Sequence, residues 1–221
     1  MELIAENTSI SVFNVYCSFV HKHQAYTVMD RVRDKSCMPY GAHCPRSLDK
    51  ICFGNKLKRI FDELRALKPP KGVVVQSYMG GSLHDSGIPH CLTRFGPFKT
   101  IQDFRLWLRG GHRLSSTEEK QDHQDWRKIK EMATKQDGHW PPPVFTHGDL
   151  NPNNTFVPND NIVGIIDWEF SGWYPNYWEY TSACYGNKLR PYWQNVLDQF
   201  LQPYSDEHEM EITRQKWWGD F

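Results

Sequence analysis

The chain has 221 residues, and its 26 Lys and Arg residues balance 26 Asp and Glu residues, so the formal net charge at pH 7 is zero. This balance argues against a nucleic-acid-binding surface and against a polybasic contact with membranes. No apolar run reaches the roughly 20 residues of a membrane span, and no basic segment followed by an apolar one stands at the N-terminus. We therefore expect a cytoplasmic protein with one sizeable core or two small lobes.

The cysteines and histidines do not form a recognisable disulfide or metal framework. The six cysteines show neither Cys-x-x-Cys spacing nor a compact cluster, so we expect free thiols. Two histidine pairs, His21 with His23 and His84 with His90, lack partner ligands at zinc-finger spacing. Surface turns therefore account for these histidines better than a metal site does.

The N-terminal part of the chain predicts a short helix and then a β-hairpin. Residues 2–6 have the character of the last turns of a helix. The β-rich runs 12–20 and 25–32 flank the polar segment 21–24, which is a plausible hairpin connection. Residues 33–46 contain Pro, Gly and Cys in a pattern that is typical of an irregular linker.

Four amphipathic helices are predicted further along the chain, each from a start signal followed by apolar residues at helical spacing. Ser47 is a candidate N-cap for the first helix, and Thr100 with Asp103 forms a capping box for the second. The serines at 115–116 start the third helix, whose apolar stripe is thin, so we expect it at the surface. Pro191 stands at the first turn of the fourth.

Residues 144–179 carry the clearest functional pattern. Asp149, Asn154 and Asp167 stand at the ends of β-rich runs, where loops can present them side by side. Their oxygen atoms are hard ligands, which suit Mg²⁺ that is also held by phosphate groups. The run at 144–146 predicts a strand, and a polar loop follows it. The runs at 155–157 and 162–166 then predict the two strands of a hairpin.

The same order of parts occurs in kinases: an Asp accepts the proton of the substrate hydroxyl, a later Asn binds metal, and an Asp behind a strand binds Mg²⁺ on the phosphates. Here His147-Gly-Asp149-Leu, followed by Ile-Asp167-Trp-Glu169-Phe-Ser-Gly, resembles the aminoglycoside phosphotransferase and choline kinase branch of the protein-kinase-like fold. The resemblance implies that Asp149 is the catalytic base, braced by His147, and that Asn154 and Asp167 hold Mg²⁺. It also implies ATP as the phosphoryl donor and a small-molecule hydroxyl as the acceptor.

The resemblance extends to the N-terminal segment. Residues 7–19 resemble the segment that follows the first helix of the small lobe in fungal members of this family. The second strand leads into the hinge there, which implies that Met29, Asp30, Arg31 and Val32 lie beside the adenine of ATP. The expected fold is α+β and protein-kinase-like, with a truncated small β lobe and a mainly helical large lobe.

On this basis we expect three parts: a remnant of the N-terminal lobe at 1–32, a linker at 33–46 and a C-terminal catalytic lobe at 47–221. The chain contains no Gly-x-Gly-x-x-Gly, and the strand lysine and helix glutamate of a complete kinase lobe are not found ahead of the hinge. We therefore expect a phosphotransferase that is impaired by these missing parts. The alternatives are a catalytically inactive kinase-like binding module and a gene-model fragment.

An aromatic stretch follows Asp167, at residues 168–180. One interpretation is an aromatic core beneath a loop, because buried aromatic residues most often serve that purpose. The other is an acceptor pocket in which aromatic faces and carboxylates select a cationic alcohol. The placement of Glu169, Trp173 and Glu179 decides between the two, and the first interpretation is favoured.

Overall fold

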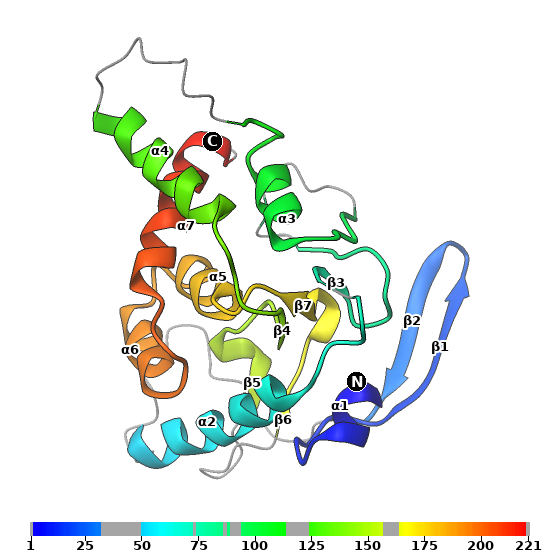
Figure 1. Cartoon of the computed structure of the whole chain (residues 1–221). Coiled ribbons are helices and arrows are strands. Elements are labelled where there is room, and N and C mark those ends of the chain that lie inside the picture. The colour runs from blue at the N-terminus through cyan, green and yellow to red at the C-terminus, as the bar shows by residue number, and fades with distance from the viewer. Residues whose placement is uncertain are drawn as a thin grey trace.

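The computed structural model describes residues 2–31, 50–72, 74–85, 88, 94–113, 124–156 and 164–219. Within these ranges the chain forms seven α-helices and seven short strands, so the predicted α+β class is confirmed. A hairpin extends from one side of a body in which helices surround two small sheets (Figure 1). None of the helices in the described part is both long and apolar enough to cross a membrane.

The predicted N-terminal hairpin is present. It follows a short helix, and the three elements are α1 (Glu2–Asn7), β1 (Val15–His21) and β2 (Gln24–Met29). The strands pair antiparallel with His21 opposite Gln24, so Lys22 and His23 form the turn. Both turn residues have positive φ, 48° and 63°, as a two-residue type I′ turn requires. The turn is shorter than the four-residue connection expected from the sequence, because pairing continues to the strand ends.

The segment before the hairpin is anchored on the helical body. Ile4 and Ile10 are buried in a core that they share with α2 (Lys50–Ala66). The backbone N and Oγ of Ser9 donate to the two carboxylate oxygens of Glu63 on α2, at 2.5 and 2.6 Å. The hydrogen bond from the Ser9 hydroxyl lowers the pKa of Glu63. These contacts hold the base of the hairpin, whereas every residue of its two strands is exposed.

Two small antiparallel sheets lie at the centre of the body. One has the order β3-β7-β4, with β3 (Gln76–Ser77), β4 (Val144–Thr146) and β7 (Gly172–Tyr174), and the other pairs β5 (Thr155–Phe156) with β6 (Gly164–Ile165). A Cβ at Gly172 would lie 2.6 Å from the backbone oxygen of Gln76, so only glycine lets β3 and β7 approach this closely. The expected hairpin between Asp149 and Asp167 is present as β5 and β6.

Five further helices complete the body: α3 (Ile101–Leu108), α4 (Gln124–Asp137), α5 (Trp178–Gly186), α6 (Pro191–Phe200) and α7 (Ser205–Trp218). Thr100 caps α3 as predicted, because its Oγ1 accepts a 2.9 Å hydrogen bond from the backbone N of Asp103. Pro191 opens α6, also as predicted. The start signals at Ser47 and at 115–116 lie outside the described residues.

The expected surface position of α4 is confirmed, since one face of the helix is exposed, including Arg127, Lys128, Glu131 and Lys135. Ile129, Met132, Ala133 and Gln136 are buried, because α4 packs against both α3 and α7. A narrow apolar stripe is sufficient for a helix that contacts two neighbours along one seam. Neither α5 nor α7 was predicted from the sequence.

The body contains two hydrophobic cores, and β7 with the start of α5 separates them. Trp173 belongs to the core formed with α2 and α6, whereas Tyr174 and Trp178 belong to the core formed with α3 and α7. Successive side chains of a strand point to opposite faces, so neighbouring aromatic residues reach different cores. The segment that follows Asp167 is thereby fixed on both sides.

Candidate active site

Asp149, Asn154 and Asp167 come together through the β5–β6 hairpin. Asp149 follows β4, and Asn154 ends a short 3-10 helix, η1 (Pro152–Asn154), that leads directly into β5. The backbone oxygen of Asn154 accepts a 3.0 Å hydrogen bond from the backbone N of Ile166, which extends the pairing of β5 with β6 by one step. Asn154 and Asp167 therefore lie at the same open end of the hairpin, as the sequence predicted for strand-end residues.

The Asp149 carboxylate is held by two asparagines. Asn154 Nδ2 donates to Asp149 Oδ2 at 2.8 Å and to the Asp149 backbone oxygen at 2.9 Å, and Asn151 Nδ2 donates to Asp149 Oδ1 at 3.0 Å. Carboxylate and carbonyl oxygens only accept hydrogen bonds, so the amide nitrogen of Asn154 must face Asp149. Its Oδ1 is then the atom that Asn154 can offer to a cation. Each Asp149 oxygen also keeps a lone pair for a substrate hydroxyl.

His147 braces the loop between β4 and η1. The ring is buried, its Nδ1 accepts a 3.2 Å hydrogen bond from the backbone N of Asp149, and its Nε2 lies 2.8 Å from the backbone oxygen of Ile166. Because Nδ1 acts as an acceptor, the ring proton must reside on Nε2 and be donated to Ile166. His147 thus links the backbone at Asp149 to the residue before Asp167. Trp168 packs edge-on against the ring, with centroids 4.7 Å apart.

Glu179 lies beneath the same loop rather than at an acceptor surface. It is fully buried on α5, and its carboxylate accepts hydrogen bonds from the backbone N of His147 at 2.6 Å and of Gly148 at 3.3 Å. Burial lowers the pKa of Arg65 on α2, and the Glu179 carboxylate opposes that shift. Arg65 in turn donates to the backbone oxygen of Phe145 at 3.0 Å. Glu179 therefore fixes the backbone after Thr146, at His147, and Arg65 fixes the backbone before it, at Phe145.

The structure separates the three residues considered for an acceptor pocket. Trp173 is buried in the first core, where it contacts Phe145 edge-on, and Glu179 is buried beneath the loop. Both positions favour the aromatic-core interpretation over the acceptor-facing position considered from the sequence. Glu169 is exposed, as is Asp167, and the two lie on the same short segment behind β6.

Asp167 adopts a strained backbone conformation. Its φ of 65° and ψ of 62° place a non-glycine residue in the left-handed region, directly before the 3-10 helix Trp168–Phe170. Conformations of this kind cost of order 1–3 kcal/mol and cluster at functional sites. Two hydrogen bonds hold the backbone on either side of Asp167 in this conformation. Trp168 Nε1 donates to the backbone oxygen of Ile165 at 2.9 Å, and Ser171 Oγ donates to the backbone oxygen of Trp168 at 2.6 Å.

The expected hinge residues lie at the base of the N-terminal hairpin. The Asp30 carboxylate accepts hydrogen bonds from the side chains of Asn14 and Tyr16, which closes the hairpin. Met29 and Arg31 are exposed, and Val32 lies outside the described residues. Their predicted contact with adenine stays a prediction.

Gly148 permits the close approach of the loop to the segment behind Asp167. Its φ is 89°, and a Cβ there would lie 2.7 Å from the backbone oxygen of Phe170. We expect Gly148→Ala to lower the free energy of unfolding by about 3 kcal/mol, through backbone strain and overpacking. Urea denaturation followed by circular dichroism measures this.

Gly186→Ala is the matched control for Gly148→Ala. Gly186 lies at the end of α5 with no positive φ, and nothing lies within 4 Å of its ideal Cβ. This substitution should change the unfolding free energy by less than about 1 kcal/mol. Equal unfolding midpoints for the two variants would show that the Gly148–Phe170 approach does not constrain the loop.

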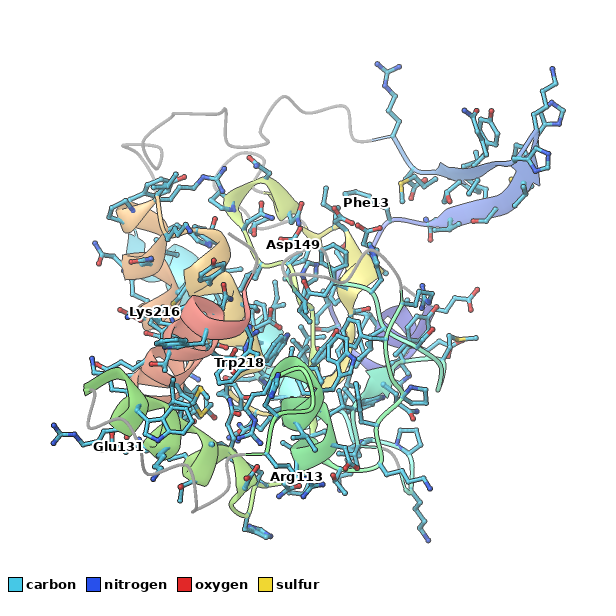
Figure 2. The ribbon with its side chains drawn as sticks, turned by 90° about the horizontal axis from the view of Figure 1, so that it is seen from above. Phe13, Arg113, Glu131, Asp149, Lys216 and Trp218 are labelled. Carbon is cyan, nitrogen blue, oxygen red and sulfur yellow. The ribbon has the colours of Figure 1, made fainter. Side chains whose placement is uncertain are left out.

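A pocket opens beside Asp149. Gly148 and Asp149 line it together with residues of α5 and α7, and its volume is about 190 Å³. Figure 2 shows Asp149 among the side chains of the helical body. Asn154 and Asp167 are not among the residues that line this pocket. Three of the lining residues come from α7, which the sequence analysis missed: Glu211, Arg214 and Gln215.

Comparison with known families identifies the family of the chain. Residues 80–212 match the sequence profile of the family described as APH, the phosphotransferase enzyme family, and this range contains the loop and both halves of the hairpin. The chain belongs to the phosphotransferase enzyme family. The expected likeness to aminoglycoside phosphotransferases is thereby confirmed. No curated protein sequence matches this chain.

Two solved structures are similar to this chain. One is the macrolide 2'-phosphotransferase MphH from Brachybacterium faecium, at 13% identity and a TM-score of 0.45, with 96% of this chain and 66% of that chain covered. The other is described as macrolide 2'-phosphotransferase type I, at 11% identity and a TM-score of 0.49, with 98% and 67% covered. The chain thus spans about two thirds of the length of these two structures.

Proposed function

We propose that this chain is the catalytic part of an ATP-dependent phosphotransferase that acts on a hydroxyl group of a small molecule. One observation carries the proposal: the Asp149 carboxylate lines the pocket and is also 2.8 Å from Asn154 Nδ2, at the end of the hairpin that holds Asp167. An acceptor in the pocket and a nucleotide near Asn154 and Asp167 would then meet at Asp149. The hydroxyl oxygen would bond to the γ-phosphorus, the bond to the β-phosphate oxygen would break, and Asp149 would take the hydroxyl proton.

Asn154 and Asp167 fit the role of Mg²⁺ ligands. The amide nitrogen of Asn154 is committed to Asp149, which leaves its oxygen for a cation, and the Asp167 carboxylate is exposed. Across the described residues there is no cluster of three or more His, Cys, Asp or Glu that could hold a metal. Mg²⁺ commonly takes one or two carboxylates plus phosphate oxygens and water, so a small ligand set suits it. When bound, the ion neutralises negative charge on the phosphates.

The proposed function also assigns a role to each part of the chain. Residues 47–221 would form the catalytic lobe, 33–46 a linker, and 1–32 part of the lobe that covers the nucleotide through Met29 to Val32. A cytoplasmic location would supply both ATP and Mg²⁺. The family match at 80–212 lies inside the proposed catalytic lobe and supports that part of the division.

A kinase-like binding module is the second candidate function. It is favoured by one observation, the lack of Gly-x-Gly-x-x-Gly within the 221 residues. In kinases that loop and a strand lysine donate hydrogen bonds to the phosphates where negative charge develops. The intact Asp149, Asn154 and Asp167 set favours the phosphotransferase instead.

We expect the 221-residue polypeptide by itself to transfer phosphate slowly. Each missing donor is typically worth about 3 kcal/mol in the transition state, which is on the order of a hundredfold in rate. The assay is ADP release from Mg²⁺-ATP over a panel of sugars and amino alcohols, with enzyme in excess. Slow release that depends on the acceptor supports the phosphotransferase. Nucleotide binding without any acceptor-dependent release would support the binding module.

A further inference from the structure

A second pocket lies between the end of α2, β4 and the segment that follows α6. Its lining includes Phe61 and Arg65 of α2, Val144 of β4 and Leu201, and its volume is about 330 Å³. The helices α2 and α6 pack side by side there (Figure 1). The pocket shares no lining residue with the one beside Asp149, so the two are separate sites. Its volume falls within the roughly 300–1,000 Å³ of pockets that hold small organic ligands.

Arg65 supplies an unused hydrogen-bonding edge to this pocket. It is half-buried in the last turn of α2, and its Nη1 donates to the backbone oxygen of Phe145 at 3.0 Å. Within the described residues its Nε and Nη2 have no hydrogen-bond partner, and neither atom is sealed from solvent. These two nitrogens form one edge of the planar guanidinium, which matches the two oxygens of a carboxylate. Because Nη1 is anchored, that edge is oriented before a ligand arrives.

The charges on the pocket wall leave Arg65 without a direct counterion. The other charged lining residues, Lys58 and Asp62, pair with each other, since Lys58 Nζ donates to both Asp62 oxygens at 3.0 and 3.1 Å. Burial lowers the pKa of Arg65, and the Glu179 carboxylate opposes this from a distance while it accepts hydrogen bonds from the backbone of the loop after β4. A ligand with one negative charge would therefore stabilise the Arg65 cation.

The remainder of the wall is largely aromatic and apolar. Phe61 and Phe200 are buried and contact each other with ring centroids 5.3 Å apart, and Tyr180 and Tyr204 lie 6.5 Å apart by the same measure. A group that binds against these rings must shed its hydration, which is favourable only for apolar surface. A phosphate dianion would bring a second negative charge for which the wall has no free cation. The wall therefore indicates an organic acid with one carboxylate and an apolar body.

We propose that this pocket binds a monoanionic organic acid, with the carboxylate on Nε and Nη2 of Arg65 and the apolar body against the aromatic side chains of α2 and α6. The site is distinct from the one that contains Asp149. Its occupation does not depend on the phosphate transfer proposed above, so either proposal can fail without the other.

A matched pair of probes tests the proposal. 3-Phenylpropionate and 3-phenylpropionamide have the same ring, the same chain and nearly the same shape, and they differ by one negative charge. Titration calorimetry with the full chain, without nucleotide, should show the carboxylate binding on the order of tenfold more tightly, which is the usual worth of one charged hydrogen bond. Equal affinities for the two probes would overturn the proposal.

Variants of α2 identify the residue responsible. Arg65→Gln should reduce the preference for 3-phenylpropionate to less than threefold, because it removes the charge and the carboxylate-binding edge. Arg59→Gln makes the same chemical change at an exposed position of α2 outside this pocket, and it should leave the preference intact. An Arg65→Gln protein that folds and keeps the full preference contradicts the proposal.

Gln202→Trp provides a second variant in case Arg65→Gln fails to fold. Gln202 lines the pocket at an exposed position, so the fold should tolerate a larger side chain there. The indole would occupy part of the pocket and leave Arg65 unchanged, so the affinity for 3-phenylpropionate should fall severalfold. An unchanged affinity would show that the acid binds elsewhere and would contradict the proposal.

Discussion

Asp149→Asn should lower the rate of phosphate transfer on the order of 10²- to 10⁴-fold, the usual contribution of a general base. Asparagine has nearly the same shape as aspartate but cannot accept the hydroxyl proton at neutral pH. Nucleotide affinity should change little, because the substitution retains the shape of the side chain and leaves the proposed metal ligands Asn154 and Asp167 in place. A single-turnover assay with enzyme in excess detects the slow rates that this comparison needs.

Asp206→Asn is the control for Asp149→Asn. Asp206 is exposed on α7 and forms a surface ion pair with Lys135 at 3.4 Å. Exposed pairs of this kind contribute less than about 1 kcal/mol, so the variant should retain the activity and stability of the wild type. If Asp149→Asn kept more than a tenth of the wild-type rate, Asp149 would not be the base.

Asp167→Asn should weaken divalent-metal binding at least about tenfold and slow phosphate transfer on the order of 10²- to 10³-fold, since it removes the one carboxylate of the proposed ligand pair. The fold should survive, because asparagine tolerates the left-handed conformation that residue 167 adopts. Mn²⁺ binding measured by electron paramagnetic resonance in the presence of ATP reports the metal affinity independently of turnover.

Glu169→Gln separates ligation from a general effect of charge. Glu169 is exposed on the same segment, two positions after Asp167, so its loss changes the local field in a similar way. Mn²⁺ affinity should then fall by no more than about twofold, because screened exposed charges interact weakly. Equal losses in the two variants would show that Asp167 attracts the ion without coordinating it.

The parts of this fold that the sequence predicted depend on short-range signals. The hairpin at 15–29, the cap at Thr100 and the start of α6 at Pro191 each depend on residues within a few positions of one another. The juxtaposition of Asn154 and Asp167 also follows from local pairing, because a hairpin necessarily brings its two ends together. Local signals of this kind can be recognised in the sequence before any tertiary contact is known.

The helices α5 and α7 could not be predicted in the same way. Most of α5 is buried, since Trp178, Glu179, Thr181, Ala183 and Cys184 are covered on several sides, so it lacks the single apolar face that marks a surface helix. In α7 the buried residues are Met210, Glu211 and Arg214, and two of these are charged. A charged residue in a sequence normally predicts an exposed position. Glu211 and Arg214 are buried because they pair with each other, and that pairing is seen only in the structure.

The positions of Glu169, Glu179 and Glu211 could not be predicted from the sequence. Glu169 and Glu179 belong to one aromatic stretch, yet Glu169 is exposed and Glu179 accepts hydrogen bonds from the backbone of His147 and Gly148. Composition cannot distinguish them, because burial depends on elements that are distant in the chain. Glu211 was not considered, although its spacing from Arg214 and Gln215 was a visible sign of a shared helix face.

By itself, the sequence determined the local arrangement of the loop and hairpin: Asp149, Asn154 and Asp167 stand at strand ends, and local pairing brings Asn154 beside Asp167. Only the tertiary structure decided what surrounds Asp149. α5 places Glu179 beneath the loop, and α7 places Glu211 in the wall of the same pocket as Asp149, which stands some sixty residues earlier in the chain. The physical reason is that hairpin and capping contacts are local, whereas packing between helices is set by the two cores, whose members come from the whole chain.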